Sequence, residues 1–388
     1  MDVADREYDL VLYGATGFVG RLIADYLAAN APAGCRWALA GRDELRLRAL
    51  RASLGDNLPI VTADAADPVA LRSLAESTRV VITTVGPYLR YGEPLVAACA
   101  AAGTDYVDLT GEPEFVDTMY LRHHSTAVAS GVRLVHAAGF DSVPHDLGAY
   151  FTVLQLPEGA PITIEAYVRT NAAISGGTFA SALTALSRPK QNAAAARERR
   201  AMEDRPEGRS ARYVPGRPHR DRLTGGWALP LPTIDPQIVV RSARAVERYG
   251  PSFRYSHFAS PARLRTAVLG TAAVGGLVVA AQVPPVRRRL SARLSPGDGP
   301  SPGRRARSWF TITFRGRAGG GASVATRVSG GDPGYTETAK MISETALSLA
   351  YDDNPPTAGQ VTTVTACGDA LLARLQAAGI GFDVLSAT

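Results

Sequence analysis

The most constraining feature of the sequence is a short apolar run that leads into a glycine-rich loop. The run Tyr8–Tyr13 (YDLVLY) is typical of a buried strand, and GATGFVG follows it. Beyond the loop, apolar residues recur at helical spacing. Gly14 permits a tight turn, Gly17 lets the backbone approach a pyrophosphate, and Gly20 lets the helix pack closely on the strand. This strand–loop–helix pattern predicts a Rossmann-type dinucleotide site. The loop residues expected to contact the cofactor are Gly14, Thr16, Gly17, Phe18 and Gly20.

Strands and helices are expected to alternate through the first 150 residues. Apolar runs typical of buried parallel strands lie at residues 36–40, 60–63, 80–85, 106–109 and 133–136. Segments with helical spacing or helix-capping residues separate these runs. This order predicts an α/β fold in which residues 1–150 form a Rossmann-type, doubly wound parallel sheet that binds the dinucleotide.

The pattern changes in the second half of the chain. Apolar and polar side chains alternate, as in antiparallel strands with one packed face, at residues 162–170, 309–317 and 322–329. Helices are expected at residues 335–350 and 368–378. We therefore predict a second, α+β substrate domain over residues 151–388 with a mainly antiparallel sheet. Its C-terminal helices either stay within this domain or pack back on the first domain.

The net charge of +6 comes largely from two arginine-rich stretches, residues 188–222 and 287–307. Both are also rich in Pro, Gly and Ser, which predicts solvated, flexible loops. They contain almost no aromatic residues that could stack on bases, which argues against a nucleic-acid partner. Contact with an acidic partner or with anionic lipid is the alternative.

One apolar segment stands apart from both domains. Residues 266–286 carry no charge, and arginines lie on either side. The length is close to the roughly 20 residues that span a bilayer, but Gly, Pro and Ala keep the hydrophobicity modest. Three interpretations stay open: a membrane-spanning helix, a helix seated in a membrane surface or lining a lipid channel, and an ordinary buried helix.

Cysteine usage and the start of the chain bear on localisation. Cys35, Cys99 and Cys367 are widely spaced, and the first nine residues are acidic and polar. These features predict a cytoplasmic protein with reduced thiols. The apolar segment adds the alternative of a peripheral position at the inner face of the plasma membrane.

The end of the second predicted strand bears on cofactor choice. An NAD site usually has an acid there for the ribose 2′-hydroxyl, but this chain has Gly41 and then Arg42. A guanidinium suits a 2′-phosphate, so we predict NADP(H) rather than NAD(H), with Asp43 as a competing influence. Asp64 follows the third strand and either contacts the adenine or stabilises a turn.

The carboxyl ends of later strands should face the same crevice. Gly86 and Pro87 would let the backbone run beside the nicotinamide ribose. Tyr88 and Tyr91 follow them, and each either donates a proton to a ligand or packs at the domain interface.

Two further loops are candidates for the substrate site. Asp141 and Ser142 follow the sixth strand and either cap the next helix or shape the site. Gly176 and Gly177 open another helix, whose N–H groups could stabilise a developing oxyanion.

The sequence offers no signature of a metal site or a nucleophile. His123, His124 and His136 have no ligand-like spacing, and no serine lies in a nucleophile-elbow pattern. We therefore expect neither a hydrolase nor a metalloenzyme.

Several of these motifs together resemble the saccharopine dehydrogenase-like oxidoreductase family. The matching segments are GATGF at 14–18, AGR at 40–42, VGPY at 85–88, YG at 91–92, GTDYVD at 103–108, TGE at 110–112 and GFDSVP at 139–144. Further segments resemble the trans-acting enoyl reductase subfamily: SGG at 175–177, FRYS at 253–256 and GDALLARL at 368–375.

The resemblance implies a nicotinamide-dependent reductase. The subfamily implies reduction of an enoyl group on an acyl chain that a polyketide synthase carrier domain presents, in complex lipid and glycolipid biosynthesis. Two alternatives stay open: reduction of another C=O or C=N bond, and a non-catalytic, lipid-associated protein that retains the Rossmann domain.

Overall fold

The first sheet is built around β1 (Tyr8–Tyr13), whose six residues are all buried. The computed structural model describes residues 6–55, 57–172, 175–231, 233–293 and 299–387, and within these ranges the sheet has seven strands in the order β14-β6-β5-β4-β1-β2-β3. Every pair is parallel. The predicted Rossmann-type parallel sheet is confirmed. Its other strands are β2 (Trp37–Gly41), β3 (Ile60–Thr62), β4 (Thr78–Thr83), β5 (Asp105–Asp108), β6 (Arg133–Val135) and β14 (Gly359–Val361).

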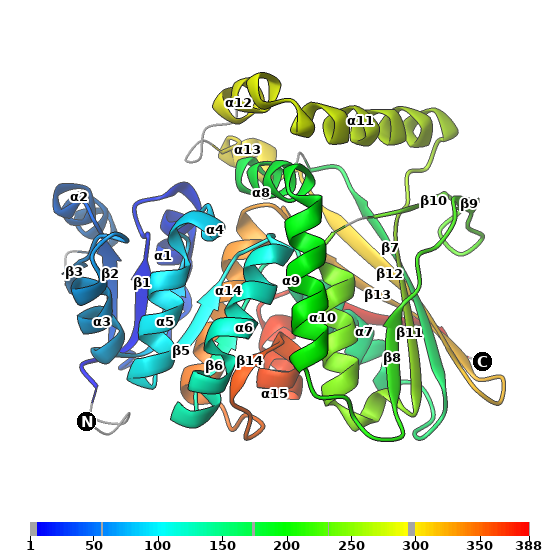
Figure 1. Ribbon diagram of the computed structural model, residues 1–388, viewed down its shortest axis with the longest axis horizontal. Helices are drawn as coiled ribbons and strands as arrows, with labels where there is room; N and C mark the ends of the chain where they lie inside the picture. Colours follow the sequence, from blue (N-terminus) through cyan, green and yellow to red (C-terminus); the bar gives the residue numbers. More distant parts are fainter. Residues whose placement is uncertain (1–5, 56, 173–174, 232, 294–298, 388) are drawn as a thin grey trace.

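Helices cover both faces of this sheet (Figure 1). Local capping residues mark several of their ends: Asp67 accepts N–H bonds at the start of α3, and Gly103 and Gly131 adopt the left-handed conformation after α5 and α6. The helices of this region are α1 (Phe18–Asn30), α2 (Glu44–Leu54), α3 (Pro68–Glu76), α4 (Tyr88–Tyr91), α5 (Glu93–Ala102) and α6 (Pro113–Ser130).

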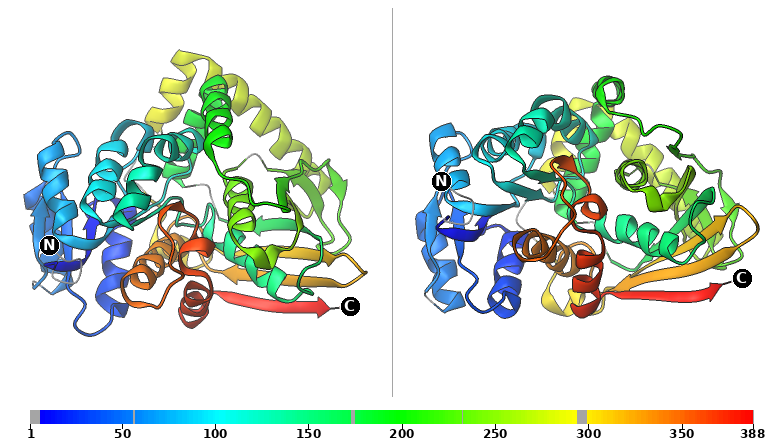
Figure 2. Two further views of the ribbon diagram at one scale, coloured as in Figure 1. Left: turned by 60° about the horizontal axis from the view of Figure 1, so that its bottom comes forward. Right: turned by 90° about the horizontal axis from the view of Figure 1, so that it is seen from below.

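The C-terminal part of the chain returns to the first sheet. Strand β14 pairs with β6, and α14 (Thr336–Tyr351) packs against α1, β1, β4 and β5. α15 (Thr363–Ala377) packs on α14 and on α7 (Val143–Leu154). Figure 2 shows these orange and red helices beside the blue and cyan first sheet. Residue 150 is therefore not a clean domain boundary, because the first sheet includes residues 359–361.

The second sheet is mixed. Within the described ranges its strands run in the order β15-β13-β12-β7-β11-β10-β9, and β8 also pairs with β11. β11 is parallel to β7 and to β8, and the other pairs are antiparallel. The sheet is thus mainly antiparallel, as predicted. Its strands are β7 (Ile162–Thr170), β8 (Ser210–Tyr213), β9 (His219–Arg220), β10 (Trp227–Pro230), β11 (Ser252–Ala259), β12 (Phe310–Ala318), β13 (Ser323–Gly330) and β15 (Gly381–Ala387).

The prediction that the arginine-rich stretches are flexible loops is wrong for most of their length. Residues 188–222 contain α9 (Pro189–Met202), β8 and β9. Arg199 is buried and pairs with Asp117 at 2.8 Å and with Glu203 at 2.7 Å. These carboxylates compensate its burial, so the charge is part of the packing rather than a solvated surface. Residues 287–307 contain the end of α12 (Pro284–Arg293) and α13 (Pro302–Arg305), while 294–298 lie outside the described residues.

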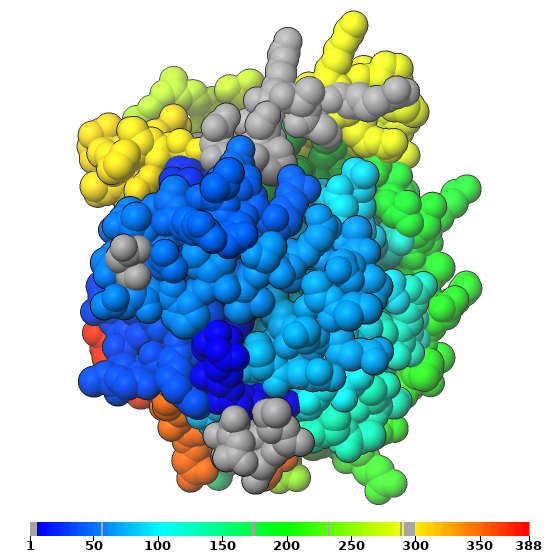
Figure 3. Space-filling model, turned by 90° about the vertical axis from the view of Figure 1, so that its left-hand side faces the viewer, coloured from blue at the N-terminus to red at the C-terminus, as the bar shows by residue number. Residues whose placement is uncertain are grey.

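The apolar segment 266–286 is not a buried helix. It forms most of α11 (Leu264–Gln282), which lies along the top of the molecule in Figure 1, and only Ala267 and Ala281 in it are buried. In length and composition, α11 would suffice to cross a membrane. In Figure 3, the yellow segments that follow it form the upper edge above the blue first sheet.

Candidate active site

The glycine-rich loop has the shape that a pyrophosphate cradle requires. Gly14 has a φ of +88° and donates its N–H to the Ala40 carbonyl oxygen at 2.9 Å. A Cβ on Gly20 would lie 2.3 Å from the Gly14 carbonyl oxygen, so no side chain fits there. Gly17 precedes α1, and no side chain in the described part of the chain caps this helix, which leaves its first N–H groups available to an anion. The loop therefore fits a dinucleotide.

Arg42 and Asp64 lie at the carboxyl ends of β2 and β3, beside Tyr13. Burial raises the pKa of Tyr13 to about 12, and the charges of Asp64 and Arg42 act on it in opposite directions. Arg42 is exposed. Asp64 accepts the Ala66 N–H at 2.8 Å, as a turn acid does. Both side chains are thus placed at the edge where the adenosine half of a dinucleotide lies in this fold.

A cavity of about 400 Å³ opens beside the glycine loop. The start of α1 and the N-terminal part of α8 (Gly176–Ser187) both line it. Predicted site residues that line it are Gly17, Phe18, Gly86, Pro87, Tyr88, Asp141, Gly176 and Gly177. The predicted residues outside its lining are Gly14, Thr16, Gly20, Arg42, Asp64, Tyr91 and Ser142. Gly17 and Phe18 of the cofactor loop therefore line the same cavity as the predicted substrate residues Asp141, Gly176 and Gly177.

The structure does not support Tyr88 or Tyr91 as a proton donor. The Tyr88 hydroxyl donates to the Thr83 carbonyl oxygen and accepts the Leu109 N–H, both at 3.2 Å. Burial also holds the pKa of Tyr88 far above its usual value. Tyr91 does not line the cavity, and its ring lies under the Arg90 guanidinium at 4.9 Å. Tyr88 is thus a structural residue of the cavity wall.

Tyr335 is a cavity residue that sequence reasoning missed. Its hydroxyl accepts the Gly176 N–H at 3.2 Å, and its ring packs edge-on against Phe18 at 5.0 Å. The hydroxyl proton has no acceptor among the described residues, so it is available to a ligand in the cavity. In the sequence this tyrosine was marked only as the first residue of the helix expected at 335–350, whereas in the structure it is the N-cap of α14.

Glu112 also lines the cavity and was given no role from the sequence, although it lies in the TGE motif. Its carboxylate accepts the N–H groups of Tyr88 at 3.1 Å and Leu89 at 3.0 Å, and the Ser181 hydroxyl at 3.3 Å. Burial raises the pKa of Glu112 despite these bonds. The Glu112 carboxylate therefore bonds to residues of both α4 and α8.

Asp141 faces the cavity without a hydrogen-bond partner among the described residues. Burial, reinforced by the charge of Asp235 and opposed by His145, raises the pKa of Asp141 to about 7. Ser142 occupies the cap position of α7, but its buried hydroxyl forms no cap bond. Neither side chain caps the helix, so the capping interpretation is wrong.

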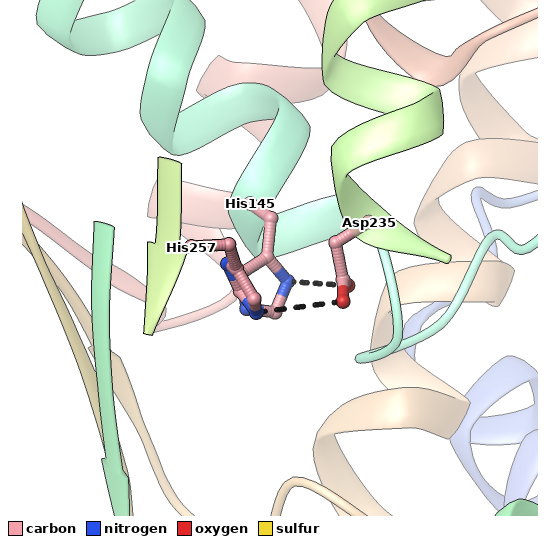
Figure 4. A group of neighbouring side chains, drawn as sticks. All are labelled: His145, Asp235 and His257. Atoms are coloured by element: carbon pink, nitrogen blue, oxygen red, sulfur yellow. Dashed lines mark ion pairs between the residues drawn. The ribbon is translucent and has the colours of Figure 1, made fainter. Parts of the chain in front are cut away.

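A buried cluster that the sequence did not reveal carries the charges that act on Asp141 (Figure 4). His145 Nδ1 lies 3.0 Å from Asp235 Oδ1, and His257 Nε2 lies 3.6 Å from Asp235 Oδ2. The Tyr255 hydroxyl is 3.2 Å from His257 Nδ1. The three side chains offer ligand atoms within 4.8 Å of one another, a spacing that could also admit a metal ion. They are too far apart in sequence to form a recognisable motif.

Comparison with known proteins decides the family. A family profile described as the saccharopine dehydrogenase NADP binding domain matches residues 10–135. A trans-acting enoyl reductase of Mycobacterium tuberculosis is 38% identical over 415 residues, 98% of each chain. Another relative from that species is 40% identical over 421 residues, 99% of each chain. The chain belongs to the trans-acting enoyl reductase family. Its relative in Mycobacterium leprae is 36% identical over 418 residues.

The fold agrees with this family assignment. The saccharopine dehydrogenase (L-Glu forming) of Saccharomyces cerevisiae superposes with a TM-score of 0.57 over 98% of this chain and 100% of its own, at 12% identity. The protein is an NADP-dependent oxidoreductase, as the sequence predicted. Among the described residues, the glycine loop and the exposed Arg42 are the ones that we expect to hold the pyrophosphate and the 2′-phosphate of NADP.

Proposed function

We propose that the protein uses NADPH to reduce the carbon–carbon double bond of an α,β-unsaturated acyl thioester. The substrate would be a polyketide or fatty acyl chain on a synthase carrier domain, in complex lipid biosynthesis. The observation that carries this proposal is the full-length similarity to proteins named trans-acting enoyl reductase. The cavity supports it, because glycines and apolar side chains such as Phe18, Val19 and Phe140 form much of its wall.

Different cavity residues would stabilise the negative charge on the thioester and supply the proton. When bound, the reduced nicotinamide supplies a hydride, which adds to the β-carbon of the substrate. Negative charge would then develop on the thioester oxygen, and we propose the Tyr335 O–H and the Gly177 N–H, both from cavity-lining residues, as the donors that stabilise it. Addition of one proton at the α-carbon completes the saturated thioester.

Asp141 is the residue we propose as the proton source. A carboxyl whose pKa is about 7 is partly protonated at neutral pH, and it gives up that proton without a large penalty. Asp141 also lines the cavity and has no competing hydrogen-bond partner among the described residues. In this proposal Tyr335, just before α14, stabilises the oxyanion, and Asp141, just before α7, supplies the proton.

A substrate screen with two variants tests the reaction. Purified protein is mixed with NADPH and an enoyl, a ketone or an imine substrate, with the enoyl group carried as a pantetheine thioester, while nicotinamide absorbance is followed. We expect turnover of the enoyl thioester. Asp141→Asn and Tyr335→Phe should each lower kcat at least about a hundredfold, with NADPH binding retained.

The outcomes separate the alternatives. Turnover of only the ketone or imine would show that another bond is the target. NADPH binding with no turnover of any substrate would favour a non-catalytic, lipid-associated role. Full activity of Asp141→Asn would exclude Asp141 as the proton source. Tyr91→Phe serves as a matched control, because Tyr91 lies outside the cavity and should retain wild-type turnover.

The proposal extends to location. A carrier-bound chain that becomes a lipid would be reduced in the cytoplasm, at or near the inner face of the plasma membrane. α11 is the feature that supports a membrane position.

A further inference from the structure

The outer side of α11 is an exposed apolar surface. Leu264, Val268, Leu269 and Val279 are exposed by 52%, 59%, 69% and 66%. At about 100° per residue these four positions fall within an arc of about 140°, which also includes Arg265. Val274 and Val278, exposed by 46% and 39%, extend the exposed apolar surface of α11 beyond this arc. Contiguous apolar faces of this kind are rare on proteins that have no partner. We call these four side chains the α11 face.

Unpaired positive charge surrounds this face. Residues 263–309 contain nine arginines, a single acid (Asp298) and no lysine. The structure describes five exposed arginines here, and none of them forms an ion pair with another described residue: Arg263, Arg265, Arg289, Arg304 and Arg307. Their positions bracket both ends of α11. The surface therefore combines apolar side chains with guanidinium groups that are available to an external anion.

The elements that carry this surface also border the cavity. Gln282 at the end of α11 donates its side-chain N–H to the Leu186 carbonyl oxygen in α8 at 2.6 Å. The N-terminal residues of α8 line the cavity. The Arg305 guanidinium in α13 lies 5.5 Å from the ring centroid of Phe18, another lining residue. In Figure 1, α8 and α13 lie directly beneath α11 and α12.

We infer that α11 lies in the surface of a membrane that contains anionic lipid, with the cavity close to that surface. A bilayer would cover both parts of the exposed surface: acyl chains meet the α11 face, and lipid phosphates meet the arginines. A second copy of the chain would bring like charges together around the face. An acidic carrier protein would pair with the arginines but leave the leucines and valines uncovered.

This position has a consequence for the substrate. A long acyl chain is poorly soluble in water, and a cavity beside the bilayer surface could receive it from the membrane. This consequence depends on the proposed function, whereas membrane docking by itself does not.

Vesicle flotation tests the docking. The full-length protein is mixed with vesicles of phosphatidylcholine alone or with about 30% phosphatidylglycerol, and the bound fraction is measured at low and high salt. We expect binding to the anionic vesicles that weakens with salt. Leu269→Asp/Val279→Asp should weaken binding at least tenfold, and Arg263→Glu/Arg265→Glu should do so on anionic vesicles. The matched control is Val69→Asp, since Val69 is 77% exposed on α3 and should bind like the wild type.

The contrary outcomes are specific. Absence of wild-type binding, or equal binding of the wild type and Leu269→Asp/Val279→Asp, would overturn the inference. A wild-type dimer that dissociates in that double variant, without vesicle binding, would assign the face to a second copy. Reduction of the soluble pantetheine thioester is measured in parallel and should be unchanged in the docking variants. Failure of the proposed function would appear instead as vesicle binding without reduction of any thioester.

Discussion

Arg42 is the residue on which cofactor preference depends. It follows β2 directly, it is exposed, and no described residue forms an ion pair with it. Asp43, the acid beside it, accepts the Arg46 N–H as the cap of α2 and pairs with the Arg46 side chain at 3.3 Å. Asp43 is therefore engaged by Arg46, and the Arg42 guanidinium is left available for a 2′-phosphate.

Replacing Arg42 should change cofactor preference rather than binding in general. Arg42→Ala removes a charge-assisted contact worth about 1.5–3 kcal/mol, so the Kd for NADPH should rise about tenfold to a hundredfold while that for NADH changes little. Fluorescence titration of both cofactors measures this. Arg48→Ala is the control, because Arg48 is exposed on α2, the helix that follows Arg42, and pairs with Glu44. Equal weakening of both cofactors would contradict the role of Arg42.

At the scale of elements, the join between β1 and α1 depends on close approach of backbone to backbone. The start of α1 touches the loop at Gly20, where a Cβ would meet the Gly14 carbonyl oxygen and the Ala15 backbone. Backbone atoms cannot move aside as the end of a side chain can. α1 and the cofactor loop therefore form one rigid unit.

Gly20→Ala should disrupt this unit although alanine favours helices by about 1 kcal/mol. The clash should lower the melting temperature and abolish NADPH binding. Gly270→Ala is the matched control, because Gly270 is also in a helix but has open space around its Cβ position. That variant should be as stable as the wild type or slightly more so. Thermal unfolding with and without NADPH checks both, and an unaffected Gly20→Ala protein would contradict the packing argument.

Across the whole molecule, contacts made by the end of the chain hold the two sheets together. One hydrophobic cluster contains Leu10 of β1, Phe314 of β12 and Leu347 of α14. Tyr351, at the end of α14, donates its hydroxyl to Asp9 Oδ2 in β1 at 2.9 Å. Arg36 pairs with the same carboxylate at 2.9 Å. Residues of α14 thus pack against the first sheet and form hydrogen bonds with it.

These contacts predict a pH-dependent stability. Burial of Asp9 raises its pKa, but the hydrogen bonds from Arg36 and Tyr351 outweigh burial and bring the pKa from 3.8 to about 2. The carboxylate therefore stabilises the fold above about pH 4, and this contribution is lost as the pH falls toward 2. Allowing for solvent around Arg36, Asp9→Asn should cost about 1–2 kcal/mol at neutral pH. Urea unfolding from about pH 6 to about pH 2.5 should show the gap to wild type narrowing, and a constant gap would contradict the role of Asp9.

Much of the first sheet and its loop could be predicted because the signals are local. The apolar run before Gly14, the Asp67 cap and the glycines after α5 and α6 act within a few residues of their own position. β11 and β15 were not predicted, since their patterns are weaker and their places depend on neighbouring strands. Residues 188–222 were misjudged because Arg199 is compensated by Asp117, which lies in a different helix.

The sequence by itself determined the order of strands and helices in the first half, the shape of the cofactor loop and the membership of an oxidoreductase family. These depend on backbone preferences, side-chain period and short motifs. Only the tertiary structure decided that β14 completes the first sheet, that Tyr335 meets Gly176 in the cavity, that Asp235 lies close enough to affect Asp141, and that α11 is exposed. The physical reason is that burial, charge coupling and exposure are properties of residues distant in the chain that packing brings together or leaves apart.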